Sequence, residues 1–157
     1  MQLEDCLTPR RVRHVPEISS RKRLLERVAN MLASAEPSLT ASEILDALRA
    51  RERLGSTVVG GGAVIARARI AGLASPLGAF VQLSHSIDYG ANEPDAAPID
   101  RLFALIVPKV PSNDVRGFVD TLGKTLARPE TAARLHATAN DEALFTALCA
   151  LDDTPTP

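Results

Sequence analysis

The stretch Arg51–Ile70 reads RERLGSTVVGGGAVIARARI, and the types of residue differ between its two halves. The first half carries hydroxyls and glycines, which could surround an anion as concave runs of backbone N–H groups do. Glycines serve equally well in a tight turn. The second half predicts a strand, because small, apolar and basic residues alternate in it. One face would carry Val64, Ala66 and Ala68, and the other Ile65, Arg67 and Arg69.

The totals of the chain favour one globular domain in the cytoplasm. The 157 residues suit a single domain, and 45% hydrophobic residues suffice for a core. A net charge of −1 and 3% aromatic residues argue against binding to nucleic acid. No signal peptide and no apolar run of the roughly 20 residues that span a bilayer are found, so we expect no membrane insertion. Cys6 and Cys149 lack metal-binding spacing and are expected to be ordinary thiols.

Two helices are predicted before the quoted stretch. Residues 1–18 form an extended lead-in, and the cluster RRVRH at 10–14 is expected to be a solvated basic loop. A first helix begins after Ser19 or Ser20, either of which can cap it, and ends before Pro37. Thr40 and Glu43 form a capping box, in which each side chain satisfies a backbone N–H group of the second helix. That helix ends before Gly55.

Strands and then helices follow the quoted stretch. Residues 78–83 predict a strand, and the apolar run at 102–107 predicts a central strand that is covered on both faces. A long helix after Pro111 has one apolar stripe, Pro129 opens a short helix, and Asn140 caps the last one. This order predicts an α/β sandwich with a small mixed sheet flanked by helices.

The usual catalytic and cofactor motifs are absent from the sequence. His14, His85 and His136 have no second histidine at metal-binding spacing, and each is expected to be structural or solvated. No phosphate-binding GxxxxGK[ST] loop occurs, and the three glycines at 60–62 lack the context of a dinucleotide-binding fold. We therefore expect no metal and no cofactor.

Several segments resemble one protein family. ILDALRARERLGSTVVGGGAVIARARI, GAFVQLSHSIDY, PIDRLFALIVP and DEALFTAL are similar to the type-2 IIA proteins of the phosphoenolpyruvate-dependent sugar phosphotransferase system, in particular to their nitrogen-regulatory branch. The most specific segment is RERLGST at 51–57. The resemblance implies a IIA type-2 sandwich over residues 3–151, followed by a disordered tail over 152–157. It also implies transfer of a phosphoryl group from a phosphocarrier protein to a histidine.

The chain departs from the family at both functional histidines. The family motif glycine-x-x-isoleucine-proline-histidine-glycine matches residues 62–68, and the acceptor histidine is replaced by Arg67. Ungapped matching places Val115 at the family's second histidine. A guanidinium stays protonated and has no lone pair for phosphoryl transfer. The resemblance therefore argues against enzymatic activity. Because Ala66 and Ala68 also differ from the motif, divergence of the whole site is favoured over a single designed substitution.

Three hypotheses about function follow from this departure. The first is a regulatory protein that binds partners without being phosphorylated; in the family, unphosphorylated members bind potassium transporters and sensor kinases. The second is a phosphoryl carrier that uses another residue. The third is a sensor that binds an anion or a phosphorylated metabolite through the cluster of Arg51, Arg53, Arg67 and Arg69. The candidate residues of its pocket are Arg51, Ser56, Thr57 and Arg67. The partner and the oligomeric state are not predicted.

Overall fold

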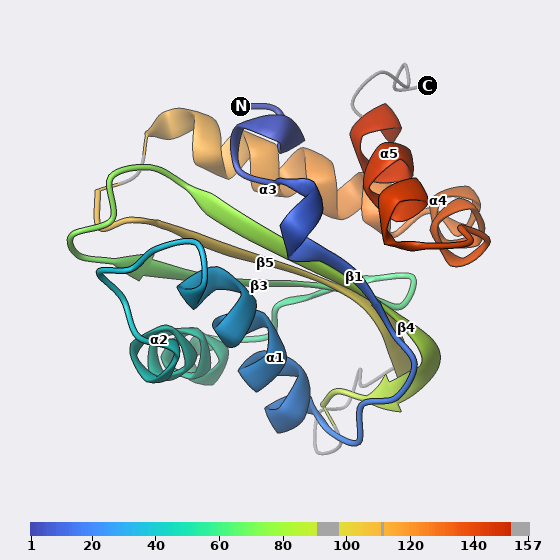
Figure 1. Cartoon of the computed structure of the whole chain (residues 1–157), viewed down its shortest axis with the longest axis horizontal. Coiled ribbons are helices and arrows are strands. Elements are labelled where there is room, and N and C mark those ends of the chain that lie inside the picture. Colours follow the sequence, from blue (N-terminus) through green and yellow to red (C-terminus); the bar gives the residue numbers. More distant parts are fainter. Residues whose placement is uncertain (91–97, 111, 152–157) are drawn as a thin grey trace.

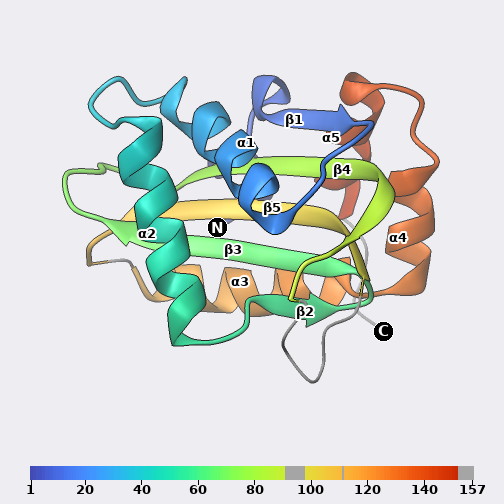
Figure 2. The same ribbon diagram turned by 90° about the horizontal axis from the view of Figure 1, so that it is seen from below.

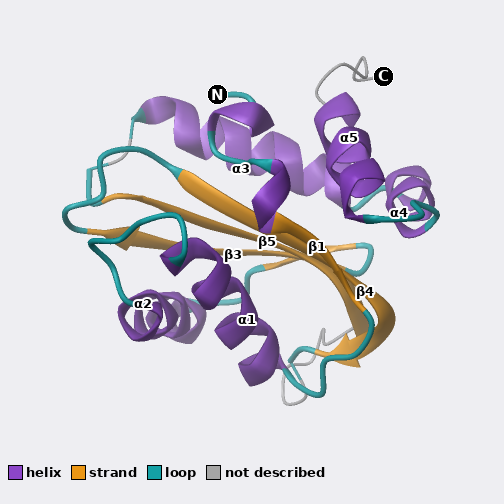
Figure 3. Cartoon of the chain, in the orientation of Figure 1, coloured by secondary structure: helices purple, strands orange, loops and turns teal. Residues whose placement is uncertain are grey.

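The computed structural model describes residues 1–90, 98–110 and 112–151 and shows a sheet between two layers of helices. In Figures 1 and 3, the helices labelled α1 and α2 lie below the sheet, and those labelled α3, α4 and α5 lie above it. The lower pair is α1 (Arg21–Ala33) and α2 (Ala41–Leu54). The upper layer contains α3 (Asn113–Leu126), α4 (Pro129–His136) and α5 (Asp141–Ala150).

The sheet has five strands in the order β1-β4-β5-β3-β2. It is mixed, because β1 is parallel to β4 and β3 to β5, while β4–β5 and β2–β3 are antiparallel. The predicted α/β sandwich with a small mixed sheet is therefore confirmed. The strands are β1 (Val12–Val15), β2 (Val58–Gly60), β3 (Ala63–Ile70), β4 (Leu77–Asp88) and β5 (Pro98–Pro108).

The central strand β5 is buried on both faces, as the apolar run at 102–107 predicted. One hydrophobic cluster lies between the sheet and the helices α1 and α2, and it contains Leu102, Ala104 and Ile106. A second cluster lies between the sheet and the helices α3, α4 and α5, and it contains the alternate residues Phe103, Leu105 and Val107. The predicted alternation in β3 is also confirmed, since Val64, Ala66 and Ala68 lie in the first cluster and Ile65 in the second.

The predicted helix caps are present. The Ser20 hydroxyl accepts a hydrogen bond from the Arg23 N–H group at 3.2 Å, and the Asn140 side chain accepts one from the Ala143 N–H group at 2.8 Å. Thr40 accepts from the Glu43 N–H group at 3.1 Å. The Glu43 carboxylate, however, accepts from the Thr40 hydroxyl at 3.2 Å, so the return bond of a capping box goes to the side chain and not to the backbone.

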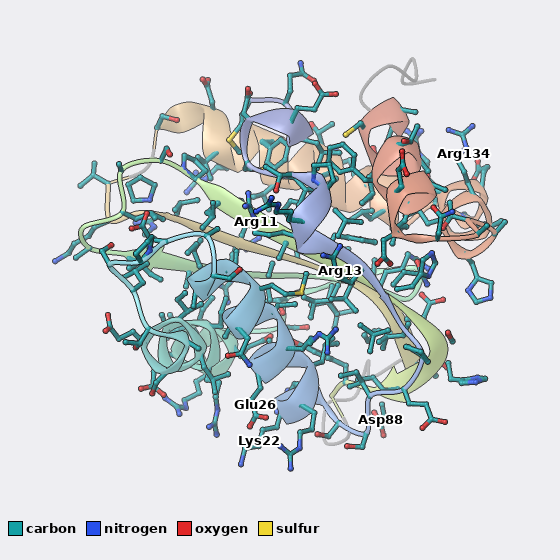
Figure 4. The ribbon with its side chains drawn as sticks, viewed as in Figure 1. Arg11, Arg13, Lys22, Glu26, Asp88 and Arg134 are labelled. Atoms are coloured by element: carbon teal, nitrogen blue, oxygen red, sulfur yellow. The ribbon has the colours of Figure 1, made fainter. Side chains whose placement is uncertain are left out.

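The prediction for residues 1–18 is wrong. This segment forms two short 3₁₀ helices, Leu3–Asp5 and Pro9–Arg11, followed by the edge strand β1. Figure 4 shows Arg11 and Arg13 on this segment, alongside the sheet. Arg11 donates to the carbonyls of Gly78 at 2.8 Å and Cys6 at 3.2 Å. The basic cluster is therefore not a solvated loop, because Arg11 pairs with the Gly78 carbonyl and His14 with the side chains of Asp141 and Thr138. Local sequence patterns do not reveal these distant partners.

The three glycines at 60–62 form the tight turn between β2 and β3. Their φ angles are +103°, +60° and +87°, which is the left-handed region that favours glycine. The turn packs against the end of α3, and the buried Arg101 connects the two: its guanidinium donates to the Gly61 carbonyl and, at 3.0 Å, to the Leu126 carbonyl. Neither this turn nor the short strand β2 was predicted as a defined hairpin.

Two sequence-based expectations concern membranes and the tail. Within the described ranges, no helix combines the length and apolarity needed to cross a bilayer. The predicted tail at 152–157 lies outside the described residues.

Replacing Gly61 with alanine should destabilise the fold. A Cβ atom at this position would overlap the Ala127 carbonyl oxygen and lie 2.8 Å from the carbonyl carbon, at a φ of +60°. We expect Gly61→Ala to lower the free energy of unfolding by about 2–4 kcal/mol, from left-handed strain plus the displacement of packed backbone. Urea denaturation followed by circular dichroism measures it.

Gly72→Ala is the matched control. Gly72 has a φ of +87°, but a Cβ atom added there would meet no other atom within 4 Å. Strain alone should cost about 1–2 kcal/mol there. Equal losses for the two variants would show that close packing of the turn against α3 contributes nothing.

Candidate functional site

The candidate site lies along the outer side of β3. The edge strand β2 pairs with only the first residues of β3, through Val58 opposite Val64 and Gly60 opposite Ala63. The chain leading into β2 continues alongside β3, where the Ile65 N–H group donates to the Thr57 carbonyl at 3.1 Å. Figure 2 shows α2 ending below β3, next to this chain segment. The middle of β3 is therefore bordered by the end of α2, the segment 55–57 and α3.

Arg67 lies on β3, opposite Leu105 of β5, and its side chain is half-buried. It alternates onto the same face of the strand as Ile65, toward α3. Burial lowers the pKa of Arg67, and the positive charge of Arg51 lowers this pKa further, while the carboxylate of Asp120 on α3 raises it. The structure thus brings Arg51 and Arg67 into electrostatic contact, with Asp120 opposing their repulsion.

Arg51 lies in the last turn of α2 and has a local role. Its guanidinium donates to the Gly55 carbonyl at 3.1 Å, which satisfies a backbone acceptor just beyond the end of the helix. Over the described ranges, neither Arg51 nor Arg67 has a carboxylate within ion-pair distance. Each guanidinium therefore retains donors that could bind an anion.

Ser56 and Thr57, the two predicted hydroxyl groups, both have partners within the segment. The exposed Ser56 accepts from the Val58 N–H group at 3.2 Å. The buried Thr57 donates to the Glu52 carboxylate at 2.9 Å. The hydroxyls therefore shape the turn into β2, and the segment does not present Thr57 to solvent.

Glu52 is a residue that the sequence analysis did not assign to the site. Its second carboxylate oxygen accepts a hydrogen bond from the Tyr89 hydroxyl. Tyr89 is 3% exposed, and burial together with the Glu52 charge raises the pKa of its hydroxyl, so Tyr89 remains a donor at neutral pH. The guanidinium of Arg21 on α1 lies 5.5 Å from the centre of the Tyr89 ring.

The position of Glu52 in the sequence already indicated that its carboxylate has partners outside the helix. A carboxylate in the last turn of a helix is opposed by the helix dipole, and here it stands between Arg51 and Arg53. Such a carboxylate requires other partners, and Tyr89 and Thr57 supply them. The distant Tyr89 could not be identified as one of these partners from local spacing.

Val115, at the position matched to the second family histidine, lies in the first turn of α3. It is half-buried and packs against the hydrophobic cluster that contains Phe118, Val119 and Ile65. A valine side chain has no hydrogen-bonding group, so this position supplies only packing.

The three histidines do not approach Arg67. His14 lies on β1, at the edge of the sheet opposite to β2, and its Nε2 is 2.8 Å from the Thr138 hydroxyl. That hydroxyl donates to the Leu135 carbonyl at 2.7 Å, so Nε2 of His14 must be the donor of the pair. His85 on β4 and His136 at the end of α4 are exposed. Within the described residues, no group of three or more metal-binding side chains gathers.

Comparisons with known proteins agree with this architecture. Residues 5–150 match the family described as phosphoenolpyruvate-dependent sugar phosphotransferase system, EIIA 2. The nitrogen regulatory protein of Pseudomonas aeruginosa is 37% identical over 146 residues, covering 92% of this chain and 93% of the relative. The nitrogen regulatory protein of Escherichia coli K12 is 31% identical over 156 residues, covering 99% and 94% of the two chains.

Solved structures show the same fold. The crystal structure of nitrogen regulatory protein IIA-Ntr from Neisseria meningitidis aligns with a TM-score of 0.80 at 25% identity, covering 92% of this chain and 97% of that one. The mannitol enzyme IIAMTL of Escherichia coli, solved in a complex with phosphorylated enzyme IIBMTL, aligns with a TM-score of 0.69 at 14% identity, covering 92% and 97%, and supports the fold alone. The chain therefore belongs to the EIIA 2 family of the phosphoenolpyruvate-dependent sugar phosphotransferase system and is a homologue of the nitrogen regulatory proteins.

Proposed function

We propose that this chain is a nitrogen-regulatory IIA-type protein that acts by binding partner proteins, without accepting a phosphoryl group at the family position. The observation that carries the proposal is Arg67. By the resemblance of residues 62–68 to the family motif, Arg67 matches the acceptor histidine, and it is half-buried on β3.

The chemistry of the position supports this proposal. Phosphoryl transfer to a side-chain nitrogen requires a lone pair, which imidazole has near neutral pH and guanidinium lacks. Val115 provides no second imidazole to orient or stabilise a phosphorylated group. The two substitutions therefore remove both family groups and leave the surrounding scaffold in place.

The retained residues support a binding role. Arg51, Ser56 and Thr57 keep the end of α2 and the turn into β2 in shape, through the Gly55 carbonyl, the Val58 N–H group and the Glu52 carboxylate. These contacts keep the backbone around Arg67 in one conformation, and a surface of fixed shape can bind a partner without phosphoryl transfer. By family resemblance, the proposed partners are the phosphocarrier protein, a potassium transporter or a sensor kinase. The complex of IIAMTL with phosphorylated IIBMTL is a precedent for a protein partner on this fold.

The first test is phosphorylation. We expect no radioactive label on this chain when it is incubated with labelled phosphoenolpyruvate, the first enzyme of the system and the phosphocarrier protein, because Arg67 cannot accept the group. A family member that retains the histidine motif is the positive control and should be labelled in the same mixture.

Stoichiometric labelling would instead establish a phosphoryl carrier that uses another residue. The candidates are then His14, His85 and His136, and each is replaced by glutamine in turn. Loss of label in one variant alone identifies the acceptor and rejects phosphorylation-independent action.

A second function is favoured by the electrostatic contact between Arg51 and Arg67. Two cations that repel each other and have no carboxylate within ion-pair distance in the described ranges could bind a small phosphorylated metabolite through charge-assisted hydrogen bonds. A regulatory protein could use such a ligand as its input.

Calorimetric titration with phosphoenolpyruvate and with inorganic phosphate tests this second function. Binding at the site predicts that Arg67→Ala weakens the affinity by about tenfold or more, the loss expected for a charge-assisted contact. Arg134→Ala is the control, because Arg134 lies on α4, at the other end of the molecule from α2 (Figure 4). Heat that Arg67→Ala leaves unchanged removes Arg67 from any anion site.

A further inference from the structure

We propose that the end of the molecule around Arg67 is the docking surface for a partner protein whose contacting face is acidic and has an apolar recess. We call it the β3 surface and define it as Arg53, Leu54, Arg67, Arg69, Lys109 and Val110. The inference rests on the proposed regulatory function and specifies the chemistry of its partner.

Two exposed apolar side chains mark the β3 surface. Leu54 is 84% exposed and Val110 is 88% exposed, and across the described ranges no other large hydrophobic residue is exposed. A single exposed leucine would need no explanation. Here both apolar side chains belong to segments that border the same strand, although they are far apart in the sequence.

The topology brings these two residues to the same end of the molecule. Leu54 is the last residue of α2, and the segment that follows it runs back along β3, with the Thr57 carbonyl bonded to the Ile65 N–H group. Val110 comes just after Pro108, which pairs with Ile70 at the end of β3. Figures 1 and 2 both place the end of β3, α2 and the loop after β5 at one end of the molecule.

The surroundings of Leu54 and Val110 are basic. Arg53, Arg69 and Lys109 are exposed, and Arg67 is half-buried on the strand between them. Glu52, the carboxylate next to Arg53 in the sequence, is directed toward Tyr89 and Thr57 and does not pair with these cations. The carboxylate of Asp120 on α3 acts on Arg67 but lies beyond ion-pair distance from it, so one carboxylate faces four cations. In a chain whose net charge is −1, this is a locally positive surface, and charge complementarity specifies carboxylates on the partner.

Two other occupants fit the β3 surface less well. A second copy docked through a twofold axis would bring the same arginines against each other, which is unfavourable. A nucleic acid would use the cations but not the apolar side chains of Leu54 and Val110, and none of the aromatic side chains in the described part of the chain is exposed for stacking on bases. An apolar anchor within a ring of charges is typical of a protein–protein contact.

The experiment begins with photo-crosslinking in the native cells. A photoreactive amino acid replaces Leu54, Val110 or, as the control, Arg134. We expect positions 54 and 110 to give adducts with the same protein, whose crosslinked segment contains acidic and apolar residues, and position 134 to give no adduct with that protein. Adducts of positions 54 and 110 with nucleic acid or with a second copy of this chain, or no adduct beyond that of position 134, would overturn the proposal.

The partner identified by crosslinking is then purified, and its affinity for variants of this chain tests whether the contact is acidic and apolar. Leu54→Asp and Arg69→Glu should each weaken the affinity by about tenfold or more, as expected at the centre of an interface. Arg134→Glu, with the same change of charge as Arg69→Glu, should not. Both substituted residues are exposed, so unchanged circular dichroism confirms that the fold is kept. Affinity that is independent of Arg69→Glu and of salt would reject an acidic partner.

The phosphorylation assay separates this inference from the proposed function. A chain that is labelled by the phosphocarrier protein but still binds an acidic partner through Leu54 and Arg69 would disprove phosphorylation-independent action and leave the β3 surface intact. A chain that is neither labelled nor crosslinked through this surface would disprove the β3 surface alone.

Discussion

The parallel pairing of β3 with β5 is the constraint on which the rest of the structure depends. Because β5 is buried on both faces, the register that places Ala66 opposite Ala104 also decides which layer each residue of β3 enters. A shift by one residue would move Val64 and Ala66 out of the core between the sheet and the helices α1 and α2, and would place arginine side chains in that core. The cost of burying an unpaired arginine therefore fixes Arg67 and Arg69 on the other face of the strand.

A second polar constraint keeps the end of α2 next to this strand. Glu52 receives hydrogen bonds from Thr57, five residues further along the chain, and from Tyr89 at the end of β4. Loss of either donor would leave a partly buried carboxylate without sufficient partners. The buried Arg101 has a similar role at the start of β3, where it connects the Gly61 turn to α3. Polar groups that face inward thus hold the end of α2 and the Gly61 turn against the first half of β3.

The sequence predicted the helices, the central strands and the alternation in β3, because each depends on local periodicity and capping. Ser20, Thr40 and Asn140 cap helices as expected, since a cap is formed by residues a few positions apart. The edge strand β1 was missed because its stability comes from pairing with β4 and from Arg11 reaching the Gly78 carbonyl, which lies 67 residues away. The Glu52–Tyr89 contact was missed for the same reason. The family resemblance grouped Arg51 with Arg67 in one candidate pocket, and the fold brings the two charges close enough to interact.

The electrostatics at Arg67 connect the two proposals, namely action without phosphoryl transfer and the choice of an acidic partner. A histidine that accepts and releases a phosphoryl group alternates between a neutral or positive state and a negative one, whereas an arginine is positive at all times. In the free protein, burial and the charge of Arg51 both act against the Arg67 cation, and the carboxylate of Asp120 opposes them. Carboxylates of a docked partner would compensate the repulsion between the Arg51 and Arg67 charges. Relief of this repulsion on association would then add to the binding free energy. The same fixed charge would repel a basic partner regardless of any phosphorylation upstream. On the proposals above, an arginine at the position matched to the acceptor histidine would select the partner's charge as well as remove the switch.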